Sequence, residues 1–545
     1  MNEQRVAVIE QNTPAYPKAP FSPAKIFPEL NSPALTFLKN ETLDESNEVY
    51  TSVRELFIKL EMDKEHIGTP DWEPFREMIK PGQHAVLKAN FVKGNHPLNE
   101  VGITSMITHA SVMRAVIDYL LLSTNGNCKI TICDVALQSS VWEEIIEGSG
   151  TKALVEFYAQ HGIQINLLDL RREISHLNDQ FVIDSRDFAD RDPLGYAAVD
   201  LGKQSALMPI IHKYKRFMIT DYGRGTVPEH HNPEKNEYCI AKTILSADLF
   251  INLPKLKSHR KTGLTCALKN LIGMNGDKRW IAHHTERSKG LGGDEFPKYV
   301  LRNWFEFRLF SFLKRNGKMG IWAASQIRKN HTRAYKIKNQ LFGLFGIDRT
   351  KKGTSTQTNT AACETYVPPE RIYHISYDAF LKTFPGSSRE VFQELNPVAS
   401  RPMEGSWYGN DTLWRTVSDL NHIIFFADKN GELRETVQRN YFCIVDGIIG
   451  GEKEAPMEHT PKFTATLVGG THPLAIDFGC ARIMDFDYNK IPMIKNLFEQ
   501  KVNFSHLTPD QIELVSNRSE LPHFHFRPAR NWKGHIETDP RWWAD

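Results

Sequence analysis

Three basic side chains, Lys255, Lys257 and His259, occupy alternate positions in the stretch "LPKLKSH". In an extended segment, alternate side chains point to the same side, so this spacing presents three basic groups to one surface. The apolar run "ADLFINL" reads as a buried strand, and Pro254 ends its hydrogen-bond ladder because proline lacks the N–H donor. The pattern predicts a basic junction just beyond the carboxyl end of a strand.

A helix is expected directly after this junction. We place its start near Thr262 or Gly263, and it carries Lys269 and Asn270. The N-terminus of a helix offers free N–H groups and positive dipole character, which favour a phosphate or carboxylate group. With the lysines of the junction and Lys269 around it, the segment predicts an anion-binding site. The alternative is that these lysines are solvated at the rim of a sheet, as most runs of charge are.

Three aspartates offer negative groups to the same region. Asp134 ends the strand-like run "ITICD", Asp446 ends "FCIVD", and Asp477 lies inside the apolar run "LAIDFGCARIM". Ligands of open α/β sheets collect at the carboxyl ends of strands, and two or three carboxylates with a substrate anion can hold Mg²⁺ or a similar divalent cation. The alternative for Asp134 and Asp446 is ordinary turn chemistry. Asp477 needs a partner, because a buried carboxylate is costly without one.

His109 and His259 are the candidates for general acid and base catalysis, because each precedes an expected helix at the edge of the sheet. A structural role is the alternative for both. The adjacent pairs at 230–231 and 283–284 do not have the i, i+4 spacing of a helical zinc site. No G-x-S-x-G, Walker A or G-x-G-x-x-G motif is present, so the sequence does not define a reaction.

The elements that must position these residues follow a β-α-β order. Strand-like runs such as "HAVLKAN" and "CKITICD" alternate with helical runs such as "THASVMRAVIDYLLL", and the pattern resumes with "TLWRTVSDLNHIIFFA", "NYFCIVDGIIGG" and "HPLAIDFGCARIM". Such alternation is typical of a mostly parallel sheet covered by helices. We therefore expect an α/β fold.

Five regions are expected along the chain. Residues 1–80 form a strand, a proline-rich strap and a helix packed on the main domain, and residues 81–293 form the first part of that α/β domain. Residues 294–400 form an inserted helical lid and linker, residues 401–500 the second part of the α/β domain, and residues 501–545 a C-terminal extension. The boundaries follow changes in composition and periodicity.

The insert is basic and aromatic. Between residues 294 and 352 it contains fourteen Lys and Arg against four Asp and Glu. A lid packed on the main domain is the favoured interpretation, and an interfacial helix on anionic lipid or on a partner protein is the alternative. Nucleic-acid binding rests on the same charges and on aromatic side chains available for stacking, but the sequence contains no recognised module, so this partner is not expected.

The totals set limits on these interpretations. The chain has 545 residues and a net charge of +2, which gives no whole-chain attraction to nucleic acid. Its first residues lack a secretory signal pattern and its longest apolar runs are too short to span a membrane, so we expect a cytoplasmic protein. Seven cysteines without a C-x-x-C pair predict neither an iron–sulfur cluster nor a structural zinc site.

Several of these segments together resemble the domain-of-unknown-function 362 family. The most diagnostic is "ADLFINLPKLKSHRKTGLTCALKNLIGMNG", and "VDGIIGGEKEAPMEHTPK" with "HPLAIDFGCARIMDFDYNKIP" resembles the closing segment of the family. "VLKANFV" and "ITHASVMRAVIDYL" resemble its opening segments, with Ala89 and Ala110 in place of the usual prolines. Many relatives carry ferredoxin-like cysteine motifs, and this chain does not.

The resemblance implies a Rossmann-like α/β fold with one candidate site. It places the following residues there: Lys88, Asn90, His109, Asp134, Lys255, Lys257, His259, Lys269, Asn270, Asp446 and Asp477. We add Asn410 and Arg415 as candidate substrate-binding residues, because the polar cluster "WYGNDTLWR" also opens an expected helix, in a stretch that resembles the longer members of the family.

The leading hypothesis is an enzyme that binds a phosphorylated or carboxylated small molecule. In it Lys255, Lys257 and Lys269 hold the anion, His259 or His109 transfers protons, and the three aspartates hold a divalent cation. The rival hypothesis is a non-catalytic binding or scaffold protein that docks on a membrane surface or a partner through residues 294–352.

Overall fold

The computed structural model describes residues 3–177, 183–219, 225–297, 404–500 and 504–539, with Met319, Trp322, Ala323, Gln326 and Arg541 in addition. Nearly all of the predicted insert at 294–400 therefore lies outside the described residues. The predictions that concern it stay predictions.

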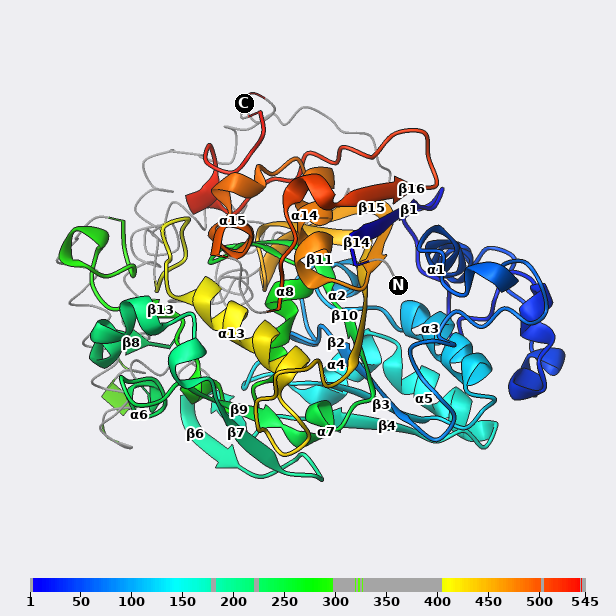
Figure 1. Cartoon of the computed structure of the whole chain (residues 1–545), viewed down its shortest axis with the longest axis horizontal. Helices are drawn as coiled ribbons and strands as arrows, with labels where there is room; N and C mark the ends of the chain where they lie inside the picture. The colour runs from blue at the N-terminus through cyan, green and yellow to red at the C-terminus, as the bar shows by residue number, and fades with distance from the viewer. Residues whose placement is uncertain are drawn as a thin grey trace, which may run out of the picture.

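A single ten-stranded sheet organises the described chain (Figure 1). Its strand order along the main path is β16-β1-β15-β14-β10-β2-β3-β4. The parallel part consists of β2 (His84–Ala89), β3 (Lys129–Asp134), β4 (Ile165–Asp169), β10 (Leu249–Leu253) and β14 (Asn440–Glu454). The first strand of this parallel part, β2, lies between β3 and β10, so the chain reverses its direction of winding between β2 and β10. This reversal is the topological switch point, where α/β sheets bind their ligands.

The other edge of the sheet is built from segments that are distant in the sequence. Strand β15 (Glu458–Gly470) runs antiparallel to β14, β1 (Arg5–Glu10) runs antiparallel to β15, and β16 (Glu513–Ser516) pairs parallel with β1. The two ends of the chain thus share one edge of the sheet. The expected α/β class is confirmed, whereas the closer likeness to a Rossmann sheet stays a prediction.

Helices cover both faces of the sheet, as Figure 1 shows. The first face packs on α1 (Glu48–Lys59), α3 (Ala110–Ser123) and α5 (Thr151–Gln160), and the second on α13 (Leu413–Phe426), α14 (Pro473–Ile483) and α15 (Pro492–Gln500). Successive side chains of a strand point to opposite faces of the sheet, so each strand contributes to the hydrophobic core on both faces. Leu87 and Ile251 lie in the core under the first face, and Val86 and Phe250 lie in the core under the second.

Shorter elements complete the described chain. The helices are α2 (Asn99–Thr104), α4 (Trp142–Gly148), α6 (Val227–His230), α7 (Lys242–Leu245) and α8 (Ala267–Asn270), with η6 (Leu271–Met274) after α8 and η7 (Lys278–Trp280) beyond it. The small strand pairs are β5 (Glu173–Leu177) with β6 (Ile183–Phe188), β7 (Tyr196–Asp200) with β9 (Glu237–Ala241), and β8 (Phe217–Met218) with β13 (His284–Thr285).

The basic junction folds differently from the prediction. Residues 255–259 form a strand, β11 (Lys255–His259), which pairs with the continuation of β14 and with β12 (Gly263–Thr265). The helix predicted to start near residue 262 or 263 is therefore wrong in its start: α8 begins at Ala267 and has four residues. Gly263 has a φ of +84°, which makes the hairpin between β11 and β12 accessible to the chain.

Strand β14 also continues through its glycines. It pairs with β15 as far as Glu454 opposite Glu458, so "GIIGG" lies inside a long hairpin arm. This extension of β14 provides the edge on which β11 pairs. Among the described residues, no helix is both long and apolar enough to cross a membrane.

Candidate functional site

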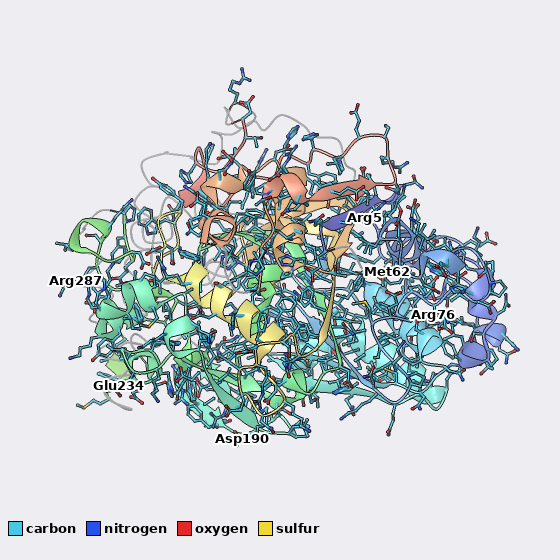
Figure 2. The ribbon with its side chains drawn as sticks, viewed as in Figure 1. Arg5, Met62, Arg76, Asp190, Glu234 and Arg287 are labelled. Carbon is cyan, nitrogen blue, oxygen red and sulfur yellow. The ribbon has the colours of Figure 1, made fainter. Side chains whose placement is uncertain are left out.

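Polar side chains gather at the carboxyl ends of β2, β3 and β10, on both sides of the switch point. Charged side chains such as Asp190, Glu234 and Arg287 are exposed and lie toward the outside of the molecule in Figure 2. Lys88, Lys255 and Lys257 are in contrast fully buried, with no exposed area. The solvated-rim alternative is thereby excluded for these lysines. The site has two neighbouring parts, which are described in turn.

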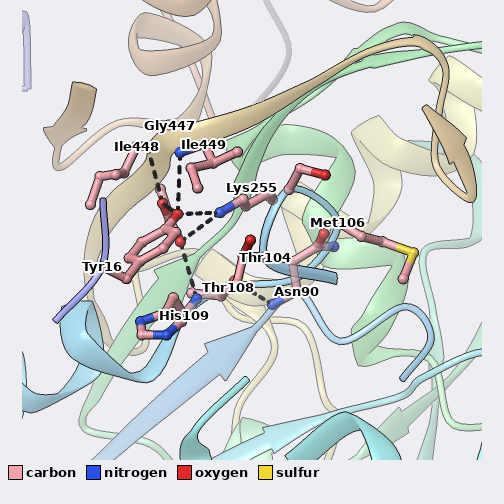
Figure 3. Close-up of polar contacts among 12 residues, drawn as sticks. Tyr16, Asn90, Thr104, Met106, Thr108, His109, Lys255, Gly447, Ile448 and Ile449 are labelled. Atoms are coloured by element: carbon pink, nitrogen blue, oxygen red, sulfur yellow. Dashed lines mark hydrogen bonds and ion pairs between the residues drawn. The ribbon is translucent and has the colours of Figure 1, made fainter. Parts of the chain in front are cut away.

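The first part, the Asp446 network, consists of Tyr16, His109, Lys255 and Asp446 (Figure 3). Asp446 Oδ2 accepts hydrogen bonds from Lys255 Nζ at 2.9 Å and from the His109 backbone N–H at 3.0 Å. Asp446 Oδ1 accepts from the Tyr16 hydroxyl at 2.6 Å and from the Ile448 N–H at 3.3 Å. The Lys255 ammonium also donates to the Tyr16 oxygen at 2.6 Å. The charge of Lys255 is therefore matched inside the protein.

Tyr16 comes from the proline-rich N-terminal strap, and sequence reasoning missed it. Its ring stacks on His109 with the ring centroids 4.1 Å apart. Burial and the neighbouring Asp446 raise the pKa of the Tyr16 hydroxyl well above its usual value. An isolated tyrosine among prolines carries no spacing signal, so only the structure can place it here.

His109 caps the N-terminus of α3, and its Nδ1 lies 2.8 Å from the Ser111 hydroxyl oxygen. Burial lowers the pKa of His109 to about 3, against a smaller opposing effect of Asp446. The imidazole is neutral at ordinary pH and engaged within its own helix turn. A neutral capping role accounts for this geometry, and the predicted acid/base role of His109 stays a prediction.

The second part, the lysine cluster, consists of Lys88, Lys257, Lys261, Lys269 and Lys278. Its best-anchored member is Lys88, which forms an ion pair with Asp134 at 2.7 Å and also donates to Asn270 Oδ1 at 3.2 Å. Asp134 further accepts the Phe91 N–H at 2.6 Å and the Val135 N–H at 2.8 Å. This anchored pair forms the floor of the cluster.

Gly273 permits this packing. A Cβ atom on Gly273 would lie 2.2 Å from Asp134 Oδ1 and 2.5 Å from Lys88 Nζ, both far inside contact distance. Any side chain at this position would therefore compete for space with the Lys88–Asp134 pair.

Lys257 has neutral partners only. Its ammonium donates to Asn90 Oδ1 at 2.6 Å and to the Met106 carbonyl at 2.6 Å, and Asn90 in turn donates to Asn270 Oδ1 at 2.8 Å. Burial lowers the pKa of Lys257 well below its usual value, and the neighbouring Lys255 and Lys269 lower it further. Within the described chain Lys257 forms no ion pair, so an anion beside it would satisfy an unmet charge.

Lys269, on α8, has neither a hydrogen bond nor an ion pair with any residue that the structure describes, and its side chain is partly exposed. Burial among its neighbours lowers the pKa of Lys269 to about 8, with Lys88 and Lys261 contributing to the shift. Lys278 donates to the Ile272 carbonyl at 2.9 Å, and burial lowers its pKa to about 7. These two amines therefore titrate close to neutral pH.

Histidines border the cluster. His259 Nδ1 accepts the N–H groups of Lys261 at 3.1 Å and Thr262 at 3.2 Å, so the proton of its neutral ring lies on Nε2. Burial lowers the pKa of His259 well below its usual value, with Lys269 contributing. His283 Nδ1 and both ring nitrogens of His284 are buried without a hydrogen-bond partner in the part of the chain that the structure describes. Buried polar atoms of this kind are normally satisfied, so these nitrogens are available to a ligand.

Three predicted residues lie outside the two parts of the site. Asp477 accepts the N–H groups of Ala267 at 2.6 Å and Leu268 at 3.3 Å, and so caps the helix that carries Lys269. Asn410 Oδ1 caps the start of α13 by accepting the Thr412 N–H at 3.0 Å. Arg415 donates to the Ala206 carbonyl at 2.9 Å. All three have structural partners, and the roles predicted for them in binding stay predictions.

The three aspartates predicted to hold a divalent cation do not meet at one point. Asp134 is paired with Lys88, Asp446 with Lys255, and Asp477 with the start of α8. In the described ranges no group of three or more His, Cys, Asp and Glu side chains is arranged to hold a metal ion. The arrangement therefore does not fit one shared cation, because the carboxylate oxygens are already occupied by N–H donors and ammonium groups.

The fold and site define an α/β protein with buried basic groups at the switch point of its sheet. The model of the family described as Domain of unknown function (DUF362) matches residues 215–482, and the chain belongs to this family. The matched segment contains the basic junction, α8 and Asp446, whereas Lys88, Asn90 and Asp134 lie before it. A search of curated proteins and a search of solved structures each found no match.

Proposed function

We propose that this protein is an enzyme that binds a phosphorylated or carboxylated small molecule at the lysine cluster. One observation carries the proposal. Lys269 is partly exposed at the switch point, and its ammonium group has no hydrogen-bond or ion-pair partner among the described residues. A desolvated charge without a counterion costs free energy, and a bound anion would recover it.

The anion contacts are assigned to Lys257 and Lys269, because these lysines have no carboxylate partner in the described chain. Lys88 is oriented by Asp134, and it adds positive charge at a fixed position. Lys255 is assigned a structural role, since Asp446 already neutralises it. This division departs from the sequence hypothesis, in which Lys255 contacts the anion directly.

Proton transfer suits the lysines better than the predicted histidines. A general acid or base works best with a pKa near the working pH. The pKa of Lys278 is lowered to about 7 and that of Lys269 to about 8, whereas the pKa of His109 is lowered to about 3. His259 remains a candidate hydrogen-bond donor through Nε2, because its Nδ1 is held by the turn.

A thermal-shift experiment tests the proposal. The wild-type protein, Lys269→Gln and the control Lys152→Gln are compared in inorganic phosphate and in chloride of equal ionic strength, each with Mg²⁺ and with a chelator. Lys152 is a suitable control because it is a surface residue paired with Glu147 at 2.8 Å. A ligand that binds only the folded state raises the melting temperature, so we expect phosphate to raise it for the wild type and the control.

In Lys269→Gln the shift caused by phosphate is expected to fall by at least half. Equal shifts in all three proteins would contradict the assignment of the site. The Mg²⁺ and chelator arms report whether the anion binds with a divalent cation. If no anion raises the melting temperature of a folded protein, the small-molecule proposal fails, and the basic insert at 294–352 becomes the region to test for a macromolecular partner.

A further inference from the structure

The environment of Lys269 in the lysine cluster differs from what the binding of an anion alone requires. An anion site needs ammonium groups that stay protonated, and exposed lysines serve that purpose with unperturbed pKa values. Lys269 differs, because other ammonium groups surround it and none of the described carboxylates pairs with it. Enzymes use such surroundings to make a lysine nucleophilic.

We propose that Lys269 is a nucleophilic amine that forms an imine with the aldehyde or ketone group of a substrate whose phosphate or carboxylate is held by the neighbouring lysines. This inference rests on the proposed function, since it assumes that the cluster binds an anionic small molecule. It adds the class of substrate, which is an oxo compound bearing an anionic group.

The contacts of the other lysines single out Lys269. Lys88 is paired with Asp134, and Lys255 with Asp446. Lys257 is fully buried and donates two hydrogen bonds. Lys261 donates to the Glu404 carbonyl, and Lys278 to the Ile272 carbonyl. Lys269 alone in the cluster combines partial exposure with an ammonium group that none of the described residues engages.

The charge of the cluster supports nucleophilicity at neutral pH. The pKa of Lys269 is lowered from 10.5 to about 8 by burial and by Lys88 and Lys261. At pH 7 this change raises the fraction of free amine by roughly 300-fold relative to an ordinary lysine. The free amine is the form that attacks a carbonyl carbon.

The step needs no oxidant or reductant. The lone pair of Lys269 Nζ attacks the carbonyl carbon, the C–N bond forms, and the carbonyl oxygen takes up a proton to give a carbinolamine. Loss of the hydroxyl group with one proton releases water, and the second amine proton leaves as the neutral C=N bond forms. Lys278, whose pKa is lowered to about 7, can donate the proton to the departing hydroxyl group.

The bordering histidines suit an oxygen-bearing substrate. His283 Nδ1 and both ring nitrogens of His284 are buried and lack a hydrogen-bond partner among the described residues. Lys261 lies close enough to both rings to lower their pKa values. Neutral imidazoles beside the cluster can hydrogen-bond the carbonyl or hydroxyl oxygen of the carbinolamine.

Reductive trapping with pyridoxal 5′-phosphate, an aldehyde that carries a phosphate group, tests the inference. The full chain is incubated with the aldehyde, the imine is reduced with borohydride, and the modified lysine is identified by peptide mass spectrometry. We expect selective modification of Lys269 at a rate that rises with pH up to about 8. Pyridoxal without phosphate should react at least 10-fold more slowly, and inorganic phosphate should protect.

Two variants and one parallel measurement make the outcome decisive. Lys269→Arg keeps the charge but removes the nucleophile, so it should lose the selective modification and keep the phosphate-dependent thermal shift. Lys152→Gln should behave as the wild type. If phosphate stabilises the protein but the label is spread over surface lysines, the imine is overturned and the anion site stands. If neither stabilisation nor selective labelling occurs, both proposals fail.

Discussion

At the scale of single residues, two lysines of the site show how environment decides function. Lys255 and Lys269 both lie near the switch point, and burial lowers the pKa of each. Asp446 forms an ion pair with Lys255 at 2.9 Å, whereas none of the described carboxylates forms an ion pair with Lys269, on which Asp134 exerts only a small opposing effect. Substitution should therefore affect folding stability in opposite directions at the two positions.

We predict that Lys269→Gln stabilises the protein in the absence of a ligand. The folded-state pKa of Lys269 lies at about 8, below the unfolded value of 10.5, so the folded state disfavours its proton. The gain from substitution is then fully present below pH 8, and it disappears as the pH rises from about 8 to 10.5. After allowance for partial exposure, we expect about 1 to 2 kcal/mol at pH 7. Urea denaturation at pH 7 and at pH 10 measures the difference.

Lys255→Gln is the matched comparison for that measurement. It removes one partner of a buried ion pair and leaves Asp446 without its counterion, which typically costs about 3 to 5 kcal/mol. The double variant Lys255→Gln with Asp446→Asn should recover part of the loss. A destabilised Lys269→Gln would show instead that Lys269 has a stabilising partner, and the functional assignment would lose its basis.

At the scale of elements, the site depends on short segments pressed against strand ends. Helix α8 has four residues, and Asp477 from α14 caps it by accepting the N–H groups of Ala267 and Leu268. Immediately beyond α8, Gly273 has no side chain, which leaves room for the Lys88–Asp134 pair beside it. The position of Lys269 is therefore set by contacts on both sides of its own helix.

We predict that Gly273→Ala disturbs the site through this contact. The added methyl group would overlap Asp134 Oδ1 and Lys88 Nζ, whose present distances from such an atom are 2.2 and 2.5 Å. Overpacking of this kind costs about 1 to 3 kcal/mol, and the displaced Lys88 should also weaken phosphate binding. Denaturation and the phosphate-dependent thermal shift measure the two effects. Gly126→Ala is the comparison for a left-handed glycine with open space around it, where the phosphate effect should be unchanged.

The sequence predicted the elements better than the contacts between them. Alternating and helical periodicities located β2, β3, β10, α3, α13 and α14, because each has a long apolar pattern of its own. The start of α8 was misplaced, because the hairpin of β11 and β12 depends on pairing with β14, nearly 200 residues away. Tertiary pairing of this kind overrides local helix signals.

The same limit applies to the candidate site. Lys88, Asn90, Asp134, Lys257 and Asn270 were predicted, and the structure joins them in one hydrogen-bonded set. Tyr16, Lys261 and Lys278 were not. Lys261 continues the basic stretch "KLKSHRK", which is the sequence signal for it, whereas Lys278 lies seventeen residues further on, outside that stretch. Nothing in the local sequence around Tyr16 indicates its partner 430 residues away.

At the scale of the whole molecule, local and total charge differ sharply. The chain carries a net charge of only +2, yet it gathers four lysines around Asp134 at the switch point: Lys88, Lys257, Lys269 and Lys278. Strands from all the predicted parts of the chain, apart from the insert, join in the sheet that supports this cluster. A site assembled in this way can form only when the sheet is complete, so ligand binding and global folding should be tightly linked.

Buried histidines should make the complete fold sensitive to acid. Eight are buried with lowered pKa values: His84, His109, His231, His259, His284, His422, His459 and His472. The folded-state pKa values lie at about 4 for His84, His231, His422 and His472, against 6.5 for an ordinary histidine. The unfolded chain therefore binds more protons than the folded one between these two pH values.

Five buried carboxylates act in the opposite direction. Burial raises the pKa of Asp294 and Asp419 to about 6 and that of Glu295 to about 7, and it also raises the pKa values of Asp118 and Asp477, so their folded forms gain protons as the pH falls. The histidines outnumber them, so the balance is a net uptake of protons on unfolding. The free energy of unfolding should decrease as the pH falls from 6.5 toward 4, by about 1.4 kcal/mol per pH unit for each net proton.

The substitution His422→Leu tests the contribution of one buried histidine to this pH dependence. Burial is the only cause that lowers the pKa of His422, to about 4, and its ring stacks on Phe426 with the centroids 4.9 Å apart. Replacing it with an apolar side chain should flatten the dependence of unfolding free energy on pH between 6.5 and 4 by about one proton. Urea denaturation at half-unit intervals of pH measures the slope. An unchanged slope would mean that His422 is already protonated in the folded state.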